Sequence, residues 1–323
     1  MHVPDGLMDP LVALIGLLEF LAFITAASYL GSKRLQDKQL PRIALLSAGI
    51  FVAQMLNFPI GGGTTGHLIG AALFAILVGP ALAVVGMTVV LIIQALMFGD
   101  GGITSFGLNA INMAVIAPLT GWGVYHLLEP MLGRSGISGK NIAVGAAAWA
   151  SVFVAAAACA AELAVSYAIS GGAYGIAATV SIPAMLGYHA VIGVGEAVIT
   201  VGVIAYLWDV SADSFLSKDE RLKNRAIWGR ITSSKTLQAS LAVLVVFALA
   251  LPLYFLYSSE GMDGLERTMD DAGIEEENAM LASPFGYGES YFAVLFAGVI
   301  GFVAVALIAL GLLRAIGSTK FRE

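Results

Sequence analysis

Cysteine is almost absent from this chain, because its one thiol, Cys159, stands in the apolar run VFVAAAACAAEL. A single thiol can form neither an internal disulfide nor a thiolate cluster around a metal. We therefore expect Cys159 to be a small, buried, apolar residue. Charged residues are scarce as well, at 12% of the sequence, against about 25% in ordinary soluble domains. Such a composition excludes a typical soluble globular protein.

Long apolar runs fill the sequence instead, with 59% hydrophobic residues and a mean hydropathy of +0.88. Runs such as 81–98 and 241–257 approach the roughly 20 residues that cross a bilayer. The sequence therefore predicts an all-α fold, a polytopic helix bundle in the cell (plasma) membrane. About nine transmembrane helices are expected, near residues 11–31, 42–57, 66–79, 81–98, 107–128, 141–170, 184–208, 236–257 and 291–315. The third and fourth are expected to meet at a tight bend at Gly79–Pro80.

The basic residues indicate how the bundle is oriented. If the N-terminus is outside, 15 of the 16 lysines and arginines fall in loops or tails on the inner face, and only Arg267 lies outside. Because inner loops carry an excess of Lys and Arg, we expect the N-terminus outside and the C-terminus inside. The segment 258–290 then lies on the outer face, with nine acidic residues: Glu260, Asp263, Glu266, Asp270, Asp271, Glu275, Glu276, Glu277 and Glu289.

The distribution of apolar runs and charges divides the chain into three predicted parts. Residues 1–208 form a core of about seven transmembrane helices, and residues 209–235 form a basic cytoplasmic connector. Residues 236–323 contain two transmembrane helices that flank the acidic loop 258–290.

Histidine is also rare, and one of the four histidines directly follows Met1. No basic stretch precedes the first apolar run and no A-x-A site closes it, so we expect the start of the chain to be retained. A histidine in second place offers three nitrogens: the terminal amine, and the amide and Nδ1 of His2. Chelate rings of five and six members hold these nitrogens roughly in one plane. One corner of a square is left open.

His67, in the stretch NFPIGGGTTGHLIG, can supply the fourth nitrogen. Such a tetragonal field suits Ni(II) or Cu(II), and admits Co(II) less readily. Since the amine and the amide must lose protons, binding should depend steeply on pH. Each histidine also has a simpler interpretation, because His2 alone carries no information and His67 could cap a helix.

Four stretches share the motifs of a known family: MHVPDGLMDP, NFPIGGGTTGHLIGAAL, LVGPALAVVGMTVVLIIQALMFGDGGITSFGLNAINMAVIAP and GYHAVIGVGEAVIT. Over residues 1 to about 208 the chain resembles the CbiM/NikM family, the substrate-binding (S) components of energy-coupling-factor transporters for cobalt and nickel. The resemblance implies Ni(II) or Co(II) as transported substrate, bound by the Met1 amine, the His2 amide and Nδ1, and His67. Three further residues fall in the matching motifs and are expected to shape the site: Asn57, Gly66 and Asn109.

The C-terminal part also carries a resemblance. The stretches SSEGMDGLERTMDDAG and SPFGYG are similar to the small companion component of such systems, the CbiN/NikN or PDGLE type. This chain has Met262 where that family has proline. The resemblance implies a companion that helps to load metal, and acidic residues on the outer face could attract cations. A merely solvated charged loop is the alternative.

Two glycine-rich stretches are not nucleotide sites. GGGTTG at 61–66 fits G-x-G-x-x-G but follows a membrane span instead of a strand. GRSGISGK at 133–140 is one residue too long for a P-loop. Without a motif for ATP hydrolysis, any energy must come from other chains. The family resemblance implies a transmembrane coupling (T) protein and a pair of cytoplasmic ATPase subunits as partners, within the lipid bilayer and without nucleic acid.

Four ionisable residues fall inside predicted spans, where such groups are costly and suggest function: Glu19, Glu162, His189 and Glu196. His189 and Glu196 are seven residues apart and share one helix face. They could relay protons, line a cavity, or form a hydrogen bond between helices. Glu162, beside the small residues AAAACAA, is expected to link closely packed helices.

Two functions fit these features. The first is the metal-capturing component of an ATP-driven importer, and the second is a stand-alone, proton-coupled permease for divalent metals that uses His189 and Glu196. An enzyme is not expected, because four nitrogens leave no open corner on the metal and no H-E-x-x-H pair is present. Nickel and cobalt stay alternatives, since the resemblance implies one ligand set for both.

Overall fold

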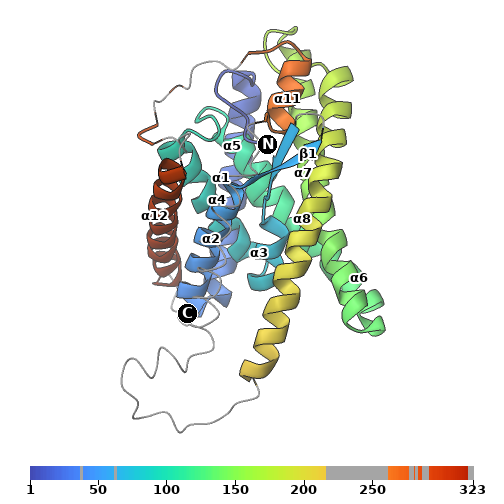
Figure 1. The fold of residues 1–323 in the computed structure, drawn as a ribbon. Coiled ribbons are helices and arrows are strands. Elements are labelled where there is room, and N and C mark those ends of the chain that lie inside the picture. The colour runs from blue at the N-terminus through green and yellow to red at the C-terminus, as the bar shows by residue number, and fades with distance from the viewer. Residues whose placement is uncertain are drawn as a thin grey trace.

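The computed structural model describes residues 1–36, 39–61, 64–215, 261–275, 280, 283–285 and 291–318. In this part the chain forms a bundle of helices, most of which run roughly along one axis (Figure 1). Six helical stretches of the described residues are long and apolar enough to cross a membrane. They lie in α1 (Pro10–Arg34), in α4 with the π-helical turn η2 (Pro80–Ile93 and Gln94–Phe98), in α5, η3 and α6 (Phe106–Ala110, Ile111–Ile116 and Ala117–Leu132), in α7 (Ile137–Ile169), in α8 (Ala178–Phe215) and in α12 (Tyr291–Ser318).

Helix α4 forms the centre of the bundle. In its most apolar stretch 78% of the residues are buried, against 22% in α1 and in α12. The outer helices expose large apolar side chains, such as Leu11, Leu14 and Leu18 on α1. A helix that is apolar all round yet exposed is typical of a membrane span. The chain is a multi-pass membrane protein.

The helices found at the predicted spans 42–57 and 66–79 are too short to cross a bilayer in the expected way. Helix α2 is Leu40–Gln54 and α3 is only Ala71–Val78, and eight residues rise about 12 Å, far less than the bilayer core. Between them β1 (Asn57–Gly61) and β2 (Thr64–His67) form an antiparallel hairpin. The all-α prediction is wrong here, because Pro59 and the nearby glycines of the sequence oppose a helix, and the described strands pair instead.

The predicted bend between the third and fourth spans is confirmed. Gly79 ends α3 with a φ of 86°, and Pro80 begins α4 directly after it. Glycine adopts this positive φ without strain. The chain therefore turns directly from the short α3 into α4.

The described C-terminal residues pack onto the N-terminal core. Helix α12 lies along α2, where Gly301 faces the ring of Phe51. The short α11 (Gly264–Asp271) lies beside α8, and the hydroxyl of Tyr188 donates to Asp271 at 3.0 Å. The predicted span 236–257 and most of the connector 209–235 lie outside the described residues.

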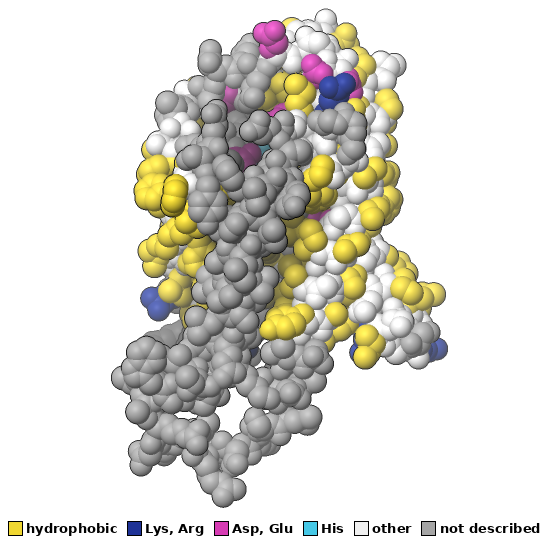
Figure 2. Space-filling model, viewed as in Figure 1, with side chains coloured by type: hydrophobic (Ala, Val, Ile, Leu, Met, Phe, Trp, Pro, Cys, Tyr) yellow, Lys and Arg dark blue, Asp and Glu magenta, His cyan; other side chains and the backbone are white. Residues whose placement is uncertain are grey.

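Charge is distributed unequally along the bundle. Figure 2 shows acidic side chains gathered at the end that carries α11, while most lysines and arginines in this view lie toward the opposite end. This is the asymmetry on which the predicted orientation depends. The orientation itself stays a prediction.

Candidate metal centre

The first residues of the chain enter the bundle before α1 begins. Met1 and Val3 are buried, with 2% and 0% of their surface exposed. The amide of Asn109 holds this segment in place, because its Oδ1 accepts from the N–H of Val3 at 2.8 Å and its Nδ2 donates to the Val3 carbonyl at 3.0 Å. The N–H of Gly102 donates to the same carbonyl at 2.8 Å. Asn109 therefore fixes the N-terminal segment next to the predicted ligands.

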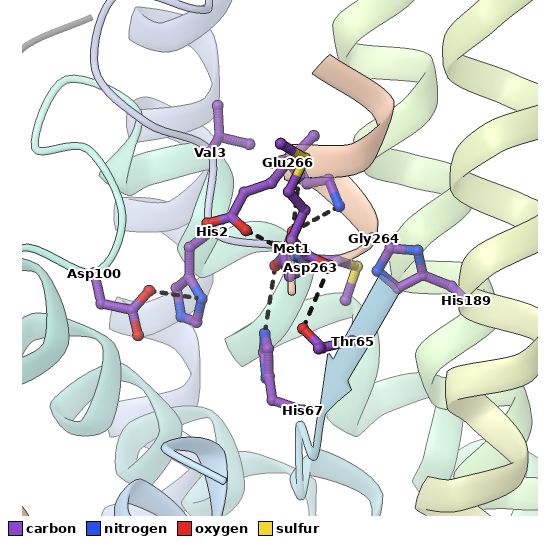
Figure 3. Close-up of polar contacts among 12 residues, drawn as sticks. Met1, His2, Val3, Thr65, His67, Asp100, His189, Asp263, Gly264 and Glu266 are labelled. Carbon is purple, nitrogen blue, oxygen red and sulfur yellow. Dashed lines mark hydrogen bonds and ion pairs between the residues drawn. The ribbon is translucent and has the colours of Figure 1, made fainter. Parts of the chain in front are cut away.

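The rings of His2 and His67 lie face to face, with centroids 5.3 Å apart and planes 27° from parallel (Figure 3). His67 is the last residue of β2 and pairs with Asn57 across the hairpin. A Cβ at Gly66 would lie 2.5 Å from Cγ1 of Ile192 on α8. The missing side chain at Gly66 therefore lets the hairpin bring His67 close to α8.

One nitrogen of His67 is free to bind a cation. Its Nδ1 lies 3.1 Å from the Leu68 carbonyl oxygen, which can only accept a hydrogen bond. The ring proton is therefore on Nδ1, and Nε2 carries a lone pair. Burial first, and then the positive charge of the terminal amine, lower the pKa of His67 to about 4. At neutral pH His67 is uncharged, the form that binds metals.

The terminal amine of Met1 is paired with Asp263. It donates to Oδ2 of Asp263 at 3.0 Å, and the same oxygen lies 3.8 Å from Nε2 of His67. Burial disfavours the ammonium form, but the charge and hydrogen bond of Asp263 outweigh it, so the pKa of the amine is raised above its ordinary value. Both nitrogens thus face one carboxylate oxygen.

Asp263 belongs to the MDGLE segment and begins α11. Its Oδ1 accepts from the N–H groups of Leu265 and Glu266 at 2.7 and 2.8 Å, and Glu266 accepts from the N–H of Asp263 at 2.7 Å. This reciprocal pairing is a capping box. The N–H of Thr65 donates to the Met262 carbonyl at 2.9 Å, which ties the segment to β2. One carboxylate oxygen of Asp263 therefore caps α11, while the other accepts a hydrogen bond from the Met1 amine.

Sequence reasoning did not single out Asp263 as part of the site. The D-G-L-E pattern is a signal for a helix start, and it stands in the companion-like motif. No local pattern places that helix start beside the first residue of the chain, because the contact joins residues 262 positions apart.

An acidic cavity of about 540 Å³ opens beside His2. Oδ1 of Asp100, on its wall, lies 3.1 Å from Nδ1 of His2. Clefts lined by one sign of charge raise the local concentration of the opposite ion. Six carboxylates line the cavity: Asp5, Asp100, Asp263, Glu266, Asp270 and Glu275.

The two polar residues predicted inside α8 have separate partners. Nδ1 of His189 lies 2.8 Å from a carbonyl one turn earlier in its own helix, and its ring borders the small pocket beside Met1. The carboxylate of Glu196 accepts from the N–H groups of Ile69 and Gly70 at 2.7 and 2.8 Å. Neither residue is the hydrogen-bond partner of the other. Glu196 instead anchors the segment that directly follows β2.

Two further predictions concern residues away from this site. Glu162 on α7 accepts from Nδ2 of Asn112 in η3 at 2.7 Å, which confirms a link between close helices. Cys159 is buried, as expected.

No three His, Cys, Asp or Glu side chains in the described part of the chain could together hold a metal. The predicted ligand set needs only two side chains, because the terminal amine and a backbone amide supply the other nitrogens.

Comparison with known proteins identifies the family of this chain. Residues 2–214 match the CbiM family, described as the cobalt uptake substrate-specific transmembrane region. The chain is 31% identical over 319 residues to a protein of Archaeoglobus fulgidus provisionally named fused nickel transport protein NikMN, covering 97% of this chain and 98% of that protein. It is 36% identical over 214 residues to the fused nickel transport protein NikMN of Rhodobacter capsulatus, covering 64% of this chain and 61% of that protein.

A solved structure shares the fold. The crystal structure of a transition metal transporter has a TM-score of 0.61 and 38% sequence identity to this chain, and covers 69% of this chain and 100% of that one. The family match covers most of the N-terminal core, and the full-length relative continues through the companion-like segment. The chain therefore belongs to the CbiM family, in its fused CbiM/NikMN form.

Proposed function

We propose that this chain captures Ni(II) or Co(II) at the outer face of the membrane, as the substrate-specific component of an ATP-driven importer. The observation that carries the proposal is the buried Met1 amine beside the rings of His2 and His67, next to an acidic cavity. The cobalt uptake description of the family and the nickel transport names of the relatives support the choice of metals.

Four nitrogens are the proposed ligands. These are the Met1 amine, the amide and Nδ1 of His2, and Nε2 of His67, a set that suits Ni(II) and admits Co(II). Two of them now contact carboxylates, Nδ1 of His2 with Asp100 and the amine with Asp263. An incoming cation replaces these contacts, and both carboxylates stay close as counter-charges.

Asp263 supports a role for the companion-like segment in loading. It borders both the acidic cavity and the small pocket that Met1 and His67 line. A cation attracted into the cavity would therefore meet Asp263 on its way to the nitrogen ligands. The segment thereby links capture at the surface to binding inside the bundle.

The energy for transport must come from partner chains. We infer a transmembrane coupling (T) protein and a pair of cytoplasmic ATPase subunits, with the metal site on the outer face and the C-terminus inside. The charge asymmetry of the bundle supports this orientation.

The alternative is a stand-alone permease driven by protons through His189 and Glu196. The structure speaks against this path, because the Glu196 carboxylate is already held by two backbone N–H groups and not by His189. These two hydrogen bonds support a structural role for Glu196.

Reconstitution into liposomes distinguishes the two functions. We expect radioactive nickel or cobalt to accumulate only when the chain is combined with its coupling protein, the ATPases and ATP. Accumulation by the chain alone, driven by a proton gradient without ATP, would overturn the importer proposal and establish the permease.

A further inference from the structure

Two buried glutamines lie between the candidate ligands. Gln94 and Gln54 have 0% and 3% of their surface exposed. Gln94 begins the π-helical turn η2 after α4, and Gln54 is the last residue of α2. Turns of this type are frequent at functional sites. Oε1 of Gln94 lies 3.3 Å from Nε2 of His2.

The hydrogen bonds of these glutamines run in one direction. Nε2 of Gln54 lies 2.6 Å from the Ile69 carbonyl, which can only accept. Oε1 of Gln54 is therefore the acceptor for Nε2 of Gln94 at 2.8 Å. Oε1 of Gln94 is then the atom that faces His2, so it is an acceptor placed for a proton on Nε2 of His2. The Ile69 carbonyl can only accept, so it determines which amide atom of each glutamine is the oxygen and which is the nitrogen. Without such a partner, the two atoms are not distinguished by position alone.

The acceptor at Nε2 favours one nitrogen of His2 for metal binding. When the ring proton is on Nε2, the lone pair of the neutral ring is on Nδ1, the nitrogen that closes a chelate ring with the His2 amide. Metal-ligating histidines generally donate their other ring N–H to a fixed acceptor, which sets the tautomer and the orientation of the ring. The carboxylate of Asp100 is also an acceptor, 3.1 Å from Nδ1, so a proton that Nδ1 shares with Asp100 must leave when a metal binds there.

The hydrogen bonds continue from Gln54 to the backbone segment that carries His67. Ile69, whose carbonyl accepts from Gln54, follows His67 by two residues, and its N–H donates to Glu196. The glutamines thus connect the His2 ring to the backbone segment that carries His67. Both glutamines, Ile69 and Glu196 are buried, so a broken link leaves polar groups that water does not reach.

We propose that Gln94 and Gln54 are positioning residues of the metal site, which give the Nε2–H of His2 a fixed acceptor, so that Nδ1 exchanges Asp100 for the metal, and which couple the His2 ring to the His67 segment. The inference rests on the proposed metal site, because a site elsewhere would make these bonds ordinary packing.

The test compares nickel binding by purified full-length protein and three variants. Gln94→Leu removes the acceptor for His2, and Gln54→Leu removes the support of Gln94 while leaving the direct partner of His2 in place. We expect each to weaken nickel affinity about 10- to 100-fold, the range typical for outer partners of metal-bound histidines. Thr88→Val is the control, since the buried Thr88 hydroxyl bonds only within α4, to Val84. Its affinity should stay within about twofold of the parent.

The double variant and the ring spectrum exclude a merely structural effect. Because one chain of bonds carries the effect, Gln54→Leu combined with Gln94→Leu should bind little worse than either alone. Nitrogen NMR of histidine-labelled protein should show Nε2 of His2 hydrogen-bonded in the parent and in Thr88→Val, and the loss of this bond in Gln94→Leu. If Gln94→Leu does not fold, Gln54→Leu carries the same comparison.

The outcomes separate this inference from the proposed function. Parent protein that binds nickel through His2 and His67, with unchanged affinity and an unchanged His2 ring spectrum in folded glutamine variants, would overturn the positioning role alone. Parent protein that binds no nickel at these histidines would overturn the metal site, and the inference with it.

Discussion

At the scale of single residues, the site is governed by a carboxylate that faces the start of the chain. Asp263 raises the pKa of the Met1 amine, against the opposing effect of burial. A proton on that amine must leave before a metal can bind. Nickel affinity should therefore fall as the pH drops below the raised pKa of the amine, and rise toward higher pH.

Asp263→Asn tests this control, because asparagine still caps a helix but carries no charge. Without the ion pair, burial alone acts on the amine, so its pKa should fall. We expect the midpoint of the pH dependence of nickel affinity to move to lower pH, while the maximal affinity at high pH decreases. Competition with a coloured chelator between pH 6 and 9 measures both quantities. An unchanged midpoint would contradict the role of Asp263.

Residue chemistry predicted part of the site in advance. A histidine beside a free amine has its own chelating nitrogens, so Met1 and His2 could be proposed as ligands from the sequence, and the structure places them beside His67. Asp263 and Gln94 could not be recognised in this way, because carboxylates and amides are common and their meaning here comes from distant contacts.

At the scale of elements, the hairpin β1–β2 must lie close to α8 to present His67. Gly66→Ala would place a methyl group against Ile192, at about 2.5 Å from its Cγ1. We expect a loss of about 1–3 kcal/mol of stability from overpacking, together with weaker nickel binding. Thermal unfolding and nickel titration measure the two effects. The added change Ile192→Ala should restore both, and failure of this rescue would contradict the packing account.

Glu196 ties α8 to the segment after the hairpin. Glu196→Gln keeps the shape of the side chain but replaces a charged acceptor by a neutral one and brings an additional donor into a fully buried place. We expect a stability loss of about 1.5–3 kcal/mol, the usual contribution of a hydrogen bond to a charged group. Denaturation in detergent checks the value. Stability equal to that of the parent would contradict the anchoring role.

The long helices were predictable, but the hairpin was not. Runs of about 20 apolar residues have one stable form in a bilayer, so α1, α4, α7 and α8 follow from hydropathy. The stretch around His67 is also apolar, and hydropathy does not register that Pro59 and the glycines oppose a helix. Its extended form is possible because the described core surrounds it: Thr64, Thr65 and His67 are buried.

At the scale of the whole molecule, the predicted orientation places α7 with its start inside and its end outside. Ser138, near the start of α7, and Ala173, after its end, are both exposed. In a Cys159→Ser background, we expect Ala173→Cys to react with a membrane-impermeant maleimide on intact cells. Ser138→Cys should react only after the membrane is opened. The reverse pattern would contradict the orientation.

The central claim is that the start of the chain and a distant imidazole together bind one divalent ion. Nickel titration of the purified protein, followed by absorption spectroscopy, tests it most directly. We predict one nickel per chain in a square-planar, all-nitrogen field. An alanine inserted ahead of Met1, or His67→Ala, should weaken binding more than about 100-fold, beyond the effect typical of outer partners. His126→Ala is the control, because that ring packs on Trp122, with centroids 4.2 Å apart, and is not part of the proposed site. Unchanged affinity and an unchanged spectrum after the insertion would contradict the account.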